Sequence, residues 1–204
     1  MLKVLVFTCL SLATAACSQT TGSITSTAAI GPLALTAAEP QLMSMSGPAF
    51  APPAFYSFCE SRPDLCASTG PTEKMTMTDR RGAELHEVNL AVNRKIREVS
   101  DQAQHGVDDV WSVPQSAGDC EDFAILKKKE LMKRGWPAST LLLTVVTASG
   151  QGHVVLTART DRGDFILDNR TNALRPWTDV RYNFFARQSQ SAHGKWERIA
   201  SAGA

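Results

Sequence analysis

Three residues that lie far apart in the sequence, Cys120, His153 and Asp168, are of the types that together perform nucleophilic acyl chemistry. Cys120 follows Asp119, a residue type that caps helices, so the thiol is expected in the first turn of a helix. A helix N-terminus carries partial positive charge and free N–H groups, which lower the pKa of a thiol and can hold an oxyanion. A thiolate also needs a base and a group that orients the base. The sequence therefore predicts a cysteine hydrolase with a Cys-His-Asp triad.

The distance between His153 and Asp168 depends on how their strands pair. His153 opens one β-rich segment and Asp168 closes the next, and the short turn between the segments implies an antiparallel pair. A two-residue turn centred on Thr160 and Asp161 places His153 and Asp168 directly opposite, about 5 Å apart. A turn shifted by one residue with the same parity places them diagonally, whereas a bulge at Gly163 would break that parity.

The elements that must position the triad indicate the α+β class. Apolar residues recur on one face of a predicted helix over 83–104, with Thr78 and Asp79 as candidate caps. A second helix is predicted over 119–134, because acidic residues occupy its first turn, basic residues its last, and Gly135 follows. Three β-rich segments come next, separated by short turns: 139–148, 153–160 and 164–168. Since helices precede an antiparallel sheet along the chain, we expect N-terminal helices packed on that sheet.

The N-terminal part of the chain predicts export. Residues 1–16 have the features of a signal peptide, with an apolar run too short for a membrane span of about 20 residues. Two cleavage modes stay open, an ordinary signal-peptidase site at Ala13-Thr14-Ala15 and lipidation of Cys17. Residues 17–54 are rich in small and polar residues and predict a flexible tether. Residues 55–204 are then the expected single domain.

The cysteines also fit an oxidising compartment. Cys59 and Cys66 flank a polar segment with a turn-forming proline, and we expect them to form a disulfide. This pairing leaves Cys120 as the unpaired thiol of the domain, which suits a reactive cysteine. Two alternatives stay open: Cys120 could be an inert buried cysteine, or Cys59 and Cys66 could bind a metal. No histidine pair or second CxxC supports a zinc site.

The net charge of the chain bears on which classes of partner we expect it to bind. The formal net charge is +1, which gives no electrostatic reason to expect nucleic acid binding. We expect a protein or peptide substrate, and membrane contact only through a lipid anchor at Cys17.

Four motifs occur in order along the domain: Trp111-Ser112-Val113-Pro114, Gly118-Asp119-Cys120-Glu121-Asp122-Phe123-Ala124, Gly152-His153-Val154-Val155-Leu156 and Leu167-Asp168-Asn169. With these motifs, the chain from about Phe55 to Trp196 resembles the bacterial transglutaminase-like cysteine proteinases. That family includes the LapG-type periplasmic proteases that release biofilm adhesins. The resemblance implies a papain/transglutaminase-like core, with cysteine as nucleophile, histidine as general base and aspartate as the orienting group. It also implies a periplasmic or secreted enzyme whose substrate is an exported or surface protein, such as an adhesin.

A calcium site is a second implication of the resemblance. LapG-type members are calcium-dependent and use carboxylates beside the nucleophile as ligands, a pattern that Asp119, Glu121 and Asp122 match. Three carboxylates beside a thiolate should raise its pKa, and a bound calcium ion would offset their field. The alternative is that Asp119 only caps the helix while Glu121 and Asp122 favour its dipole.

Two residues ahead of the nucleophile are candidate oxyanion donors. Trp111 and Gln115 each carry a side-chain N–H that could stabilise the tetrahedral intermediate. The alternatives are core packing for Trp111 and a plain loop position for Gln115.

The leading functional hypothesis is a cysteine peptidase that works through an acyl-enzyme. One alternative keeps the acyl-enzyme but lets an amine resolve it, which would give transglutaminase activity. The other alternative is a non-catalytic scaffold or binding protein of the same fold.

Overall fold

The structure is a computed structural model that describes residues 39–200 of the chain. The predicted signal peptide at residues 1–16 and the candidate lipidation site Cys17 lie outside the described residues. None of the helices within residues 39–200 has the length and apolar character needed to span a membrane.

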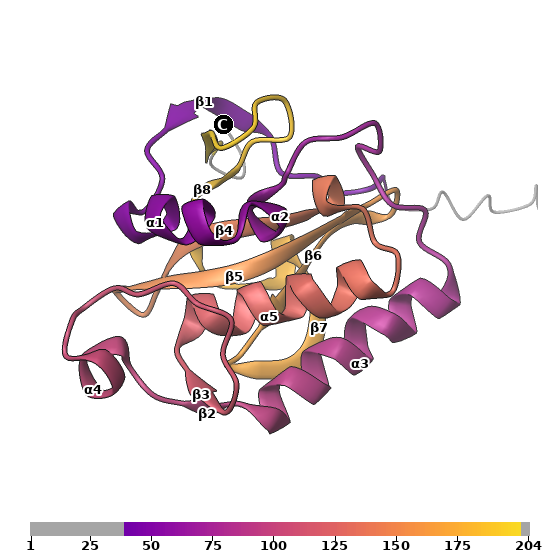
Figure 1. Cartoon of the computed structure of the whole chain (residues 1–204). Coiled ribbons are helices and arrows are strands. Elements are labelled where there is room, and N and C mark those ends of the chain that lie inside the picture. Colours follow the sequence, from indigo (N-terminus) through magenta and orange to yellow (C-terminus); the bar gives the residue numbers. More distant parts are fainter. Residues whose placement is uncertain (1–38, 201–204) are drawn as a thin grey trace, which may run out of the picture. The chain divides into compact units, whose positions relative to one another are not determined.

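A seven-stranded antiparallel sheet forms the centre of the described domain, with the strand order β1-β9-β8-β4-β5-β6-β7 (Figure 1). The strands are β1 (Met45–Ala49), β4 (Leu141–Ala148), β5 (Gln151–Thr160), β6 (Gly163–Asp168), β7 (Thr171–Pro176), β8 (Asn183–Gln188) and β9 (Trp196–Ile199). Side chains alternate between the two faces. Val154 and Leu156 of β5 enter the larger core, which also contains helix residues, whereas Val155 enters a second cluster on the other face.

Helices cover one face of this sheet, with α3 and α5 side by side (Figure 1). The helices are α1 (Pro53–Ser61), α2 (Pro63–Cys66), α3 (Asp79–Lys95), α4 (Asp101–His105) and α5 (Cys120–Lys133). Short elements complete the domain: the parallel pair β2 (Arg97–Glu98) and β3 (Ala117–Gly118), and the 3-10 turns η1 (Ala138–Thr140) and η2 (Trp177–Asp179). The predicted α+β class, with helices packed on an antiparallel sheet, is confirmed.

The structure corrects the predicted start of the domain at residue 55. Met43 is buried, and its backbone N–H donates to Asp164 Oδ2 at 2.7 Å. Two residues later β1 begins, and it pairs with β9 at the edge of the sheet. Most residues of this segment are small or polar, so its composition does not indicate burial. Met43 and β1 are ordered by contacts with strands that are distant in the sequence. Residues 39–54 therefore belong to the domain rather than to the predicted tether at 17–54.

The helix predicted over 83–104 is divided into two. Its start is as expected, since Thr78 caps α3 and accepts a hydrogen bond from Arg81 N. Helix α3 ends at Lys95, because the following backbone bonds to the segment ahead of Cys120 instead of continuing the helix: Arg97 N donates to Ser116 O and Val99 N donates to Gly118 O. These two bonds fix the approach of the chain to the nucleophile.

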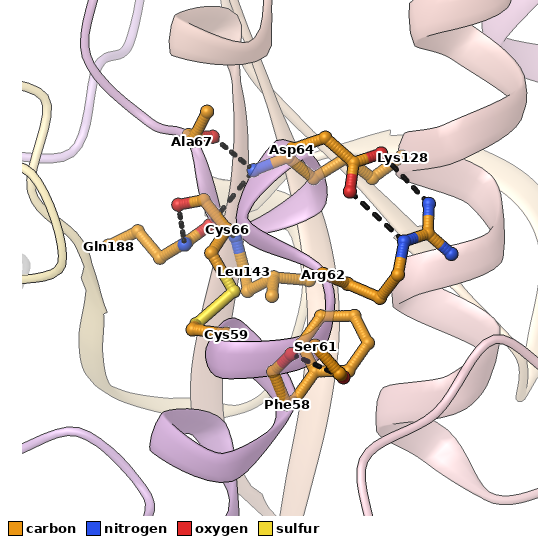
Figure 2. The surroundings of a disulfide bond; sticks show 10 residues. All are labelled: Phe58, Cys59, Ser61, Arg62, Asp64, Cys66, Ala67, Lys128, Leu143 and Gln188. Atoms are coloured by element: carbon orange, nitrogen blue, oxygen red, sulfur yellow. Dashed lines mark hydrogen bonds and ion pairs between the residues drawn. A yellow bond between two sulfur atoms is a disulfide. The ribbon is translucent and has the colours of Figure 1, made fainter.

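The predicted disulfide between Cys59 and Cys66 is confirmed, and it joins α1 to α2 (Figure 2). Lys128 of α5 donates to the backbone oxygen of Ala67 at 2.6 Å. Gln188 of β8 donates to Cys66 O at 3.1 Å and accepts from Lys128 at 3.2 Å. The disulfide-bonded segment is therefore tied to the same helix that presents Cys120.

Candidate active site

Cys120 is the first residue of α5, as the cap and charge pattern predicted. Asp119 occupies the N-cap position, but its carboxylate makes no capping hydrogen bond. Instead Asp119 Oδ2 accepts a hydrogen bond from Asp101 N at 3.2 Å. The expected capping role of Asp119 is therefore replaced by a contact with α4.

The half-buried thiol of Cys120 lies against the strand that carries His153. Val154 N donates to Cys120 Sγ across 3.4 Å, so the sulfur contacts β5 one residue from His153. The thiol itself donates to Glu121 Oε2 at 3.2 Å. Cys120 is also the one free cysteine within residues 39–200. The fold thus brings the candidate nucleophile and the candidate base to adjacent positions.

His153 and Asp168 are hydrogen-bonded to each other. In the observed register Thr160 pairs with Gly163, so the turn is shifted by one residue and no bulge forms. This is the diagonal arrangement, one of the two that the sequence allowed. His153 Nε2 lies 2.9 Å from Asp168 Oδ1, and the two side chains are 1% and 2% exposed.

Asp168 is surrounded by donors. Its Oδ1 also accepts from Arg170 N at 3.0 Å, and its Oδ2 accepts from the Tyr182 hydroxyl at 2.6 Å. Burial alone would raise the pKa of Asp168, but the hydrogen bonds from His153, Tyr182 and the Arg170 backbone outweigh it and lower the pKa to about 2. The carboxylate is therefore ionised and can only accept, which means that His153 Nε2 carries the proton of this bond.

Tyr182 is a site residue that the sequence did not reveal. Its ring packs edge-on against the imidazole of His153, with centroids 5.8 Å apart. Burial, and then the hydrogen bond to Asp168 and its charge, raise the pKa of Tyr182 to about 12, so its hydroxyl stays a donor at neutral pH. In the sequence Tyr182 lies in an apolar stretch, and only the pairing of β8 with β4 brings that stretch to the site.

Carboxylates gather beside the thiol, but the set differs from the predicted one. Asp101, Asp119 and Glu121 each place an oxygen within 4.8 Å of the others. The Oδ1 atoms of Asp101 and Asp119 are buried and have no hydrogen-bond partner among the described residues. Asp101 comes from α4 and was missed, since nothing in its spacing links it to Cys120.

Asp122, the third predicted metal ligand, lies outside this group. Its Oδ1 accepts hydrogen bonds from the backbone and the hydroxyl of Ser112, at 2.8 and 3.2 Å. Asp122 thus holds the segment ahead of β3 against the start of α5. Burial raises the pKa of Asp122 to about 7.

The surroundings of Cys120 oppose its ionisation. Burial first, and then the negative charge of Glu121, raise the pKa of the thiol far above its usual range. Burial and then the neighbouring Asp119 likewise raise the pKa of Glu121, to about 9. The lowering of the thiol pKa that was expected from the helix N-terminus is therefore outweighed. The raising of that pKa that was expected from the neighbouring carboxylates is present.

The two candidate oxyanion donors occupy different environments. The indole N–H of Trp111 donates to Asp109 Oδ1 at 2.9 Å, and its ring packs edge-on against Phe55 and Trp196. Gln115 is exposed and lines an open hollow ahead of β3. The ring of Trp111 therefore packs in the core and its N–H is engaged by Asp109, while the amide of Gln115 has room to move.

Comparisons with known proteins bear on the fold and on the family of the chain. Calcium-bound LapG of Legionella pneumophila shares the fold at a TM-score of 0.50 and 23% identity, with 76% of this chain and 87% of that chain covered. EGTA-treated LapG gives the same score and identity over 76% of this chain and 82% of that chain. A search of curated proteins finds no significant match. The family model of the bacterial transglutaminase-like cysteine proteinases matches residues 45–204, and the chain therefore belongs to that family.

Proposed function

We propose that this protein is an exported cysteine peptidase that cleaves a peptide bond of an exported or surface protein through Cys120. The observation that carries the proposal is the contact of Cys120 Sγ with the backbone of β5 beside His153, whose imidazole is held by ionised Asp168. These two contacts support a nucleophile, a base and an orienting group in the roles that acyl transfer requires.

The protonation of His153 follows from its partner. Because Nε2 donates to Asp168, the neutral ring keeps its lone pair on Nδ1, which is the nitrogen able to take a proton from Cys120. Asp168 stabilises the imidazolium that results. Tyr182 and Arg170 N keep Asp168 charged throughout.

The reaction then proceeds in two stages. His153 takes the thiol proton, Cys120 Sγ attacks the carbonyl carbon, and backbone N–H groups at the start of α5 stabilise the oxyanion. The C–N bond breaks as His153 returns the proton to the leaving amine, which leaves an acyl-enzyme. Water attacks the thioester with His153 as base, and the acid product leaves as the thiol is restored.

We further propose that Asp101, Asp119 and Glu121 hold a calcium ion. Their oxygens converge within 4.8 Å, and two of these carboxylates have buried oxygens without hydrogen-bond partners among residues 39–200. Such oxygens are the ligands that calcium prefers. When bound, the ion would offset the negative charge that raises the pKa of Cys120.

Export is proposed from the signal-like residues 1–16 and from the disulfide, which fits an oxidising compartment. A surface adhesin is the substrate class that the family resemblance implies. The intact mass of the mature protein tests export and separates a free N-terminus from a lipidated Cys17.

The triad is tested with a thiol-alkylating probe and with peptide N-termini. With calcium present, we expect Cys120 of the wild type to react faster than a free model thiol, and His153→Ala to remove that advantage, while the exposed control His86→Ala retains it. New N-termini should appear in an envelope extract treated with wild-type enzyme and not with Cys120→Ala. Equal alkylation of all variants, or incorporation of a labelled amine without cleavage, would overturn the peptidase proposal.

A further inference from the structure

A hollow of about 220 Å³ lies next to Asp168, and we call it the Asp168 hollow. It is lined by residues of β6, β7 and the segment that leads from η2 into β8. Its polar lining consists of Asp168, Thr171, Arg175, Asp179, Arg181 and Tyr182. The volume is below the range of roughly 300–1,000 Å³ that is usual for sites of whole small molecules. It suits a single side chain.

The Asp168 hollow adjoins the catalytic base through Tyr182. The Tyr182 hydroxyl donates to Asp168, and its ring packs against the imidazole of His153. Ile166 of β6 also lines the hollow, and its side chain belongs to the cluster on the face of the sheet away from α5. An occupant would therefore sit on the histidine side of the site rather than on the side of the helix that carries Cys120.

Two arginines that line the hollow are free to bind an anion. Arg175 and Arg181 are exposed and form no ion pair within residues 39–200. Both oxygens of Asp168 are already bonded, to His153 and the Arg170 backbone on one side and to Tyr182 on the other. Asp179 is the one remaining carboxylate of the lining. Two guanidinium groups without ion pairs among the described residues thus line a small hollow beside Asp168 and Asp179, and Asp179 accepts a hydrogen bond from the Thr178 hydroxyl at 3.3 Å.

The chemistry of acyl transfer indicates which part of a substrate would lie near the hollow. The acyl half of the substrate is bonded to Cys120, whereas the leaving amine receives its proton from His153. The part of the substrate on the leaving side of the scissile bond therefore lies nearest to His153, and Tyr182 packs on His153 and lines the hollow.

We propose that the Asp168 hollow is a substrate subsite that takes an acidic side chain from the leaving side of the scissile bond, held by Arg175 and Arg181. This assignment rests on the proposed peptidase function. The Thr171 hydroxyl, which also lines the hollow, supplies a further donor for a carboxylate.

A binding experiment tests the subsite without turnover. Cys120→Ala protein with calcium present is titrated with short peptides blocked at both ends, one with a central Asp and one with Asn, and amide shifts are followed by NMR. We expect the Asp peptide to bind roughly fivefold more tightly, the upper limit for an exposed ion pair. The preference should disappear in Arg175→Gln and Arg181→Gln and persist in Arg162→Gln, an exposed arginine in the turn at the other end of β6. Equal binding of the two peptides, or a preference unchanged in both hollow variants, overturns the subsite.

A cleavage experiment separates this inference from the function on which it rests. A blocked synthetic peptide library is digested with calcium-loaded wild type, Arg181→Glu and Arg162→Gln. We expect Asp and Glu to be enriched at one position after the cut, and Arg181→Glu to shift that position toward Lys and Arg. If the wild type cleaves no peptide, the peptidase proposal fails. Cleavage without acidic enrichment, or with enrichment that Arg181→Glu leaves unchanged, overturns only the subsite.

Discussion

The candidate site has a strand side, around His153 and Asp168, and a helix side, around Cys120. The two sides differ in how fully their carboxylates are hydrogen-bonded. On the strand side, Asp168 accepts hydrogen bonds from His153, Tyr182 and the Arg170 backbone, and both of its oxygens are engaged. On the helix side, Asp101, Asp119 and Glu121 converge beside the thiol, and two of them keep buried oxygens without partners among the described residues. The base is therefore preorganised by the protein alone, and the nucleophile is not.

This difference indicates where the enzyme is controlled. A satisfied hydrogen-bond network in a buried site has one stable arrangement and little reason to change. Uncompensated negative charge beside a thiol is unfavourable and can be relieved by a cation. Control by calcium is thus expected at Cys120, through its reactivity, rather than at His153.

Asp168→Asn breaks the strand side and should have the largest effect. The amide can donate as well as accept, so it no longer holds His153 in the tautomer that leaves Nδ1 basic. We expect kcat/KM to fall by about 10² to 10⁴, the upper value being that of the same change in a serine triad. Peptide hydrolysis measures the loss, and thermal unfolding shows whether the variant is folded. A folded variant with unchanged kcat/KM would remove Asp168 from the mechanism.

Asp101→Asn changes the helix side and should have opposite effects with and without calcium. In excess chelator the variant should alkylate at Cys120 faster than wild type, by roughly tenfold, because one charge that opposes the thiolate is gone. In limiting calcium it should alkylate more slowly, because a ligand is lost. Alkylation rates across a calcium titration measure both effects.

Asp108→Asn is the matched control, since Asp108 is an exposed acid in the loop after α4. It should follow the wild type at every calcium concentration. An Asp101→Asn curve that follows the control would show that Asp101 neither opposes the thiolate nor binds the ion.

Local patterns predicted the parts of the site that depend on local structure. Turn chemistry and strand parity placed His153 and Asp168 on one face, and charge bias defined the helix that begins at Cys120. The disulfide followed from the spacing of Cys59 and Cys66. Each of these depends on residues within about one element of each other, where sequence patterns are informative.

The missed parts all depend on contacts between distant segments. Asp101 becomes a neighbour of Asp119 only because the chain after Lys95 leaves the helix and pairs with the segment before Cys120. Met43 is anchored by Asp164, 121 positions away. Periodicity and spacing in the sequence do not indicate such long-range pairings. The early strand, the break after Lys95 and the place of Asp101 beside Asp119 and Glu121 were therefore not predicted.

Gly118→Ala tests how tightly the helix side is built. An added Cβ would lie 2.8 Å from Asp122 Cβ and even closer to its carboxylate, which holds Ser112. The clash involves a short, buried side chain with little room to move, so we expect a loss of about 1–3 kcal/mol in the free energy of unfolding. Chemical denaturation measures it. Gly82→Ala on α3 is the control, because its Cβ would meet only Met77 Sδ at 3.9 Å, and it should be neutral or stabilising.

Tyr182→Phe should have the smallest effect. It removes one hydrogen bond to Asp168 on the strand side and leaves the charged carboxylate in place. The variant loses the hydroxyl donor to Asp168 Oδ2, but Oδ1 keeps its hydrogen bonds from His153 and the Arg170 backbone. We expect the free energy of unfolding at pH 7 to fall by about 1 kcal/mol.

The pH dependence of that loss tests its cause. The pKa of Asp168 is about 2 in the folded protein against an ordinary value of 3.8, so its hydrogen bonds stabilise the fold above pH 3.8 and this contribution is lost as the pH falls through 2. Without the Tyr182 hydroxyl the pKa of Asp168 should rise toward 3.8, and the stability gap between wild type and variant should narrow as the pH falls below 3.8. Denaturation at pH 7 and at pH 3 measures the gap. A gap of equal size at both values would mean that Tyr182 stabilises the fold by packing on His153 rather than by holding the charge of Asp168.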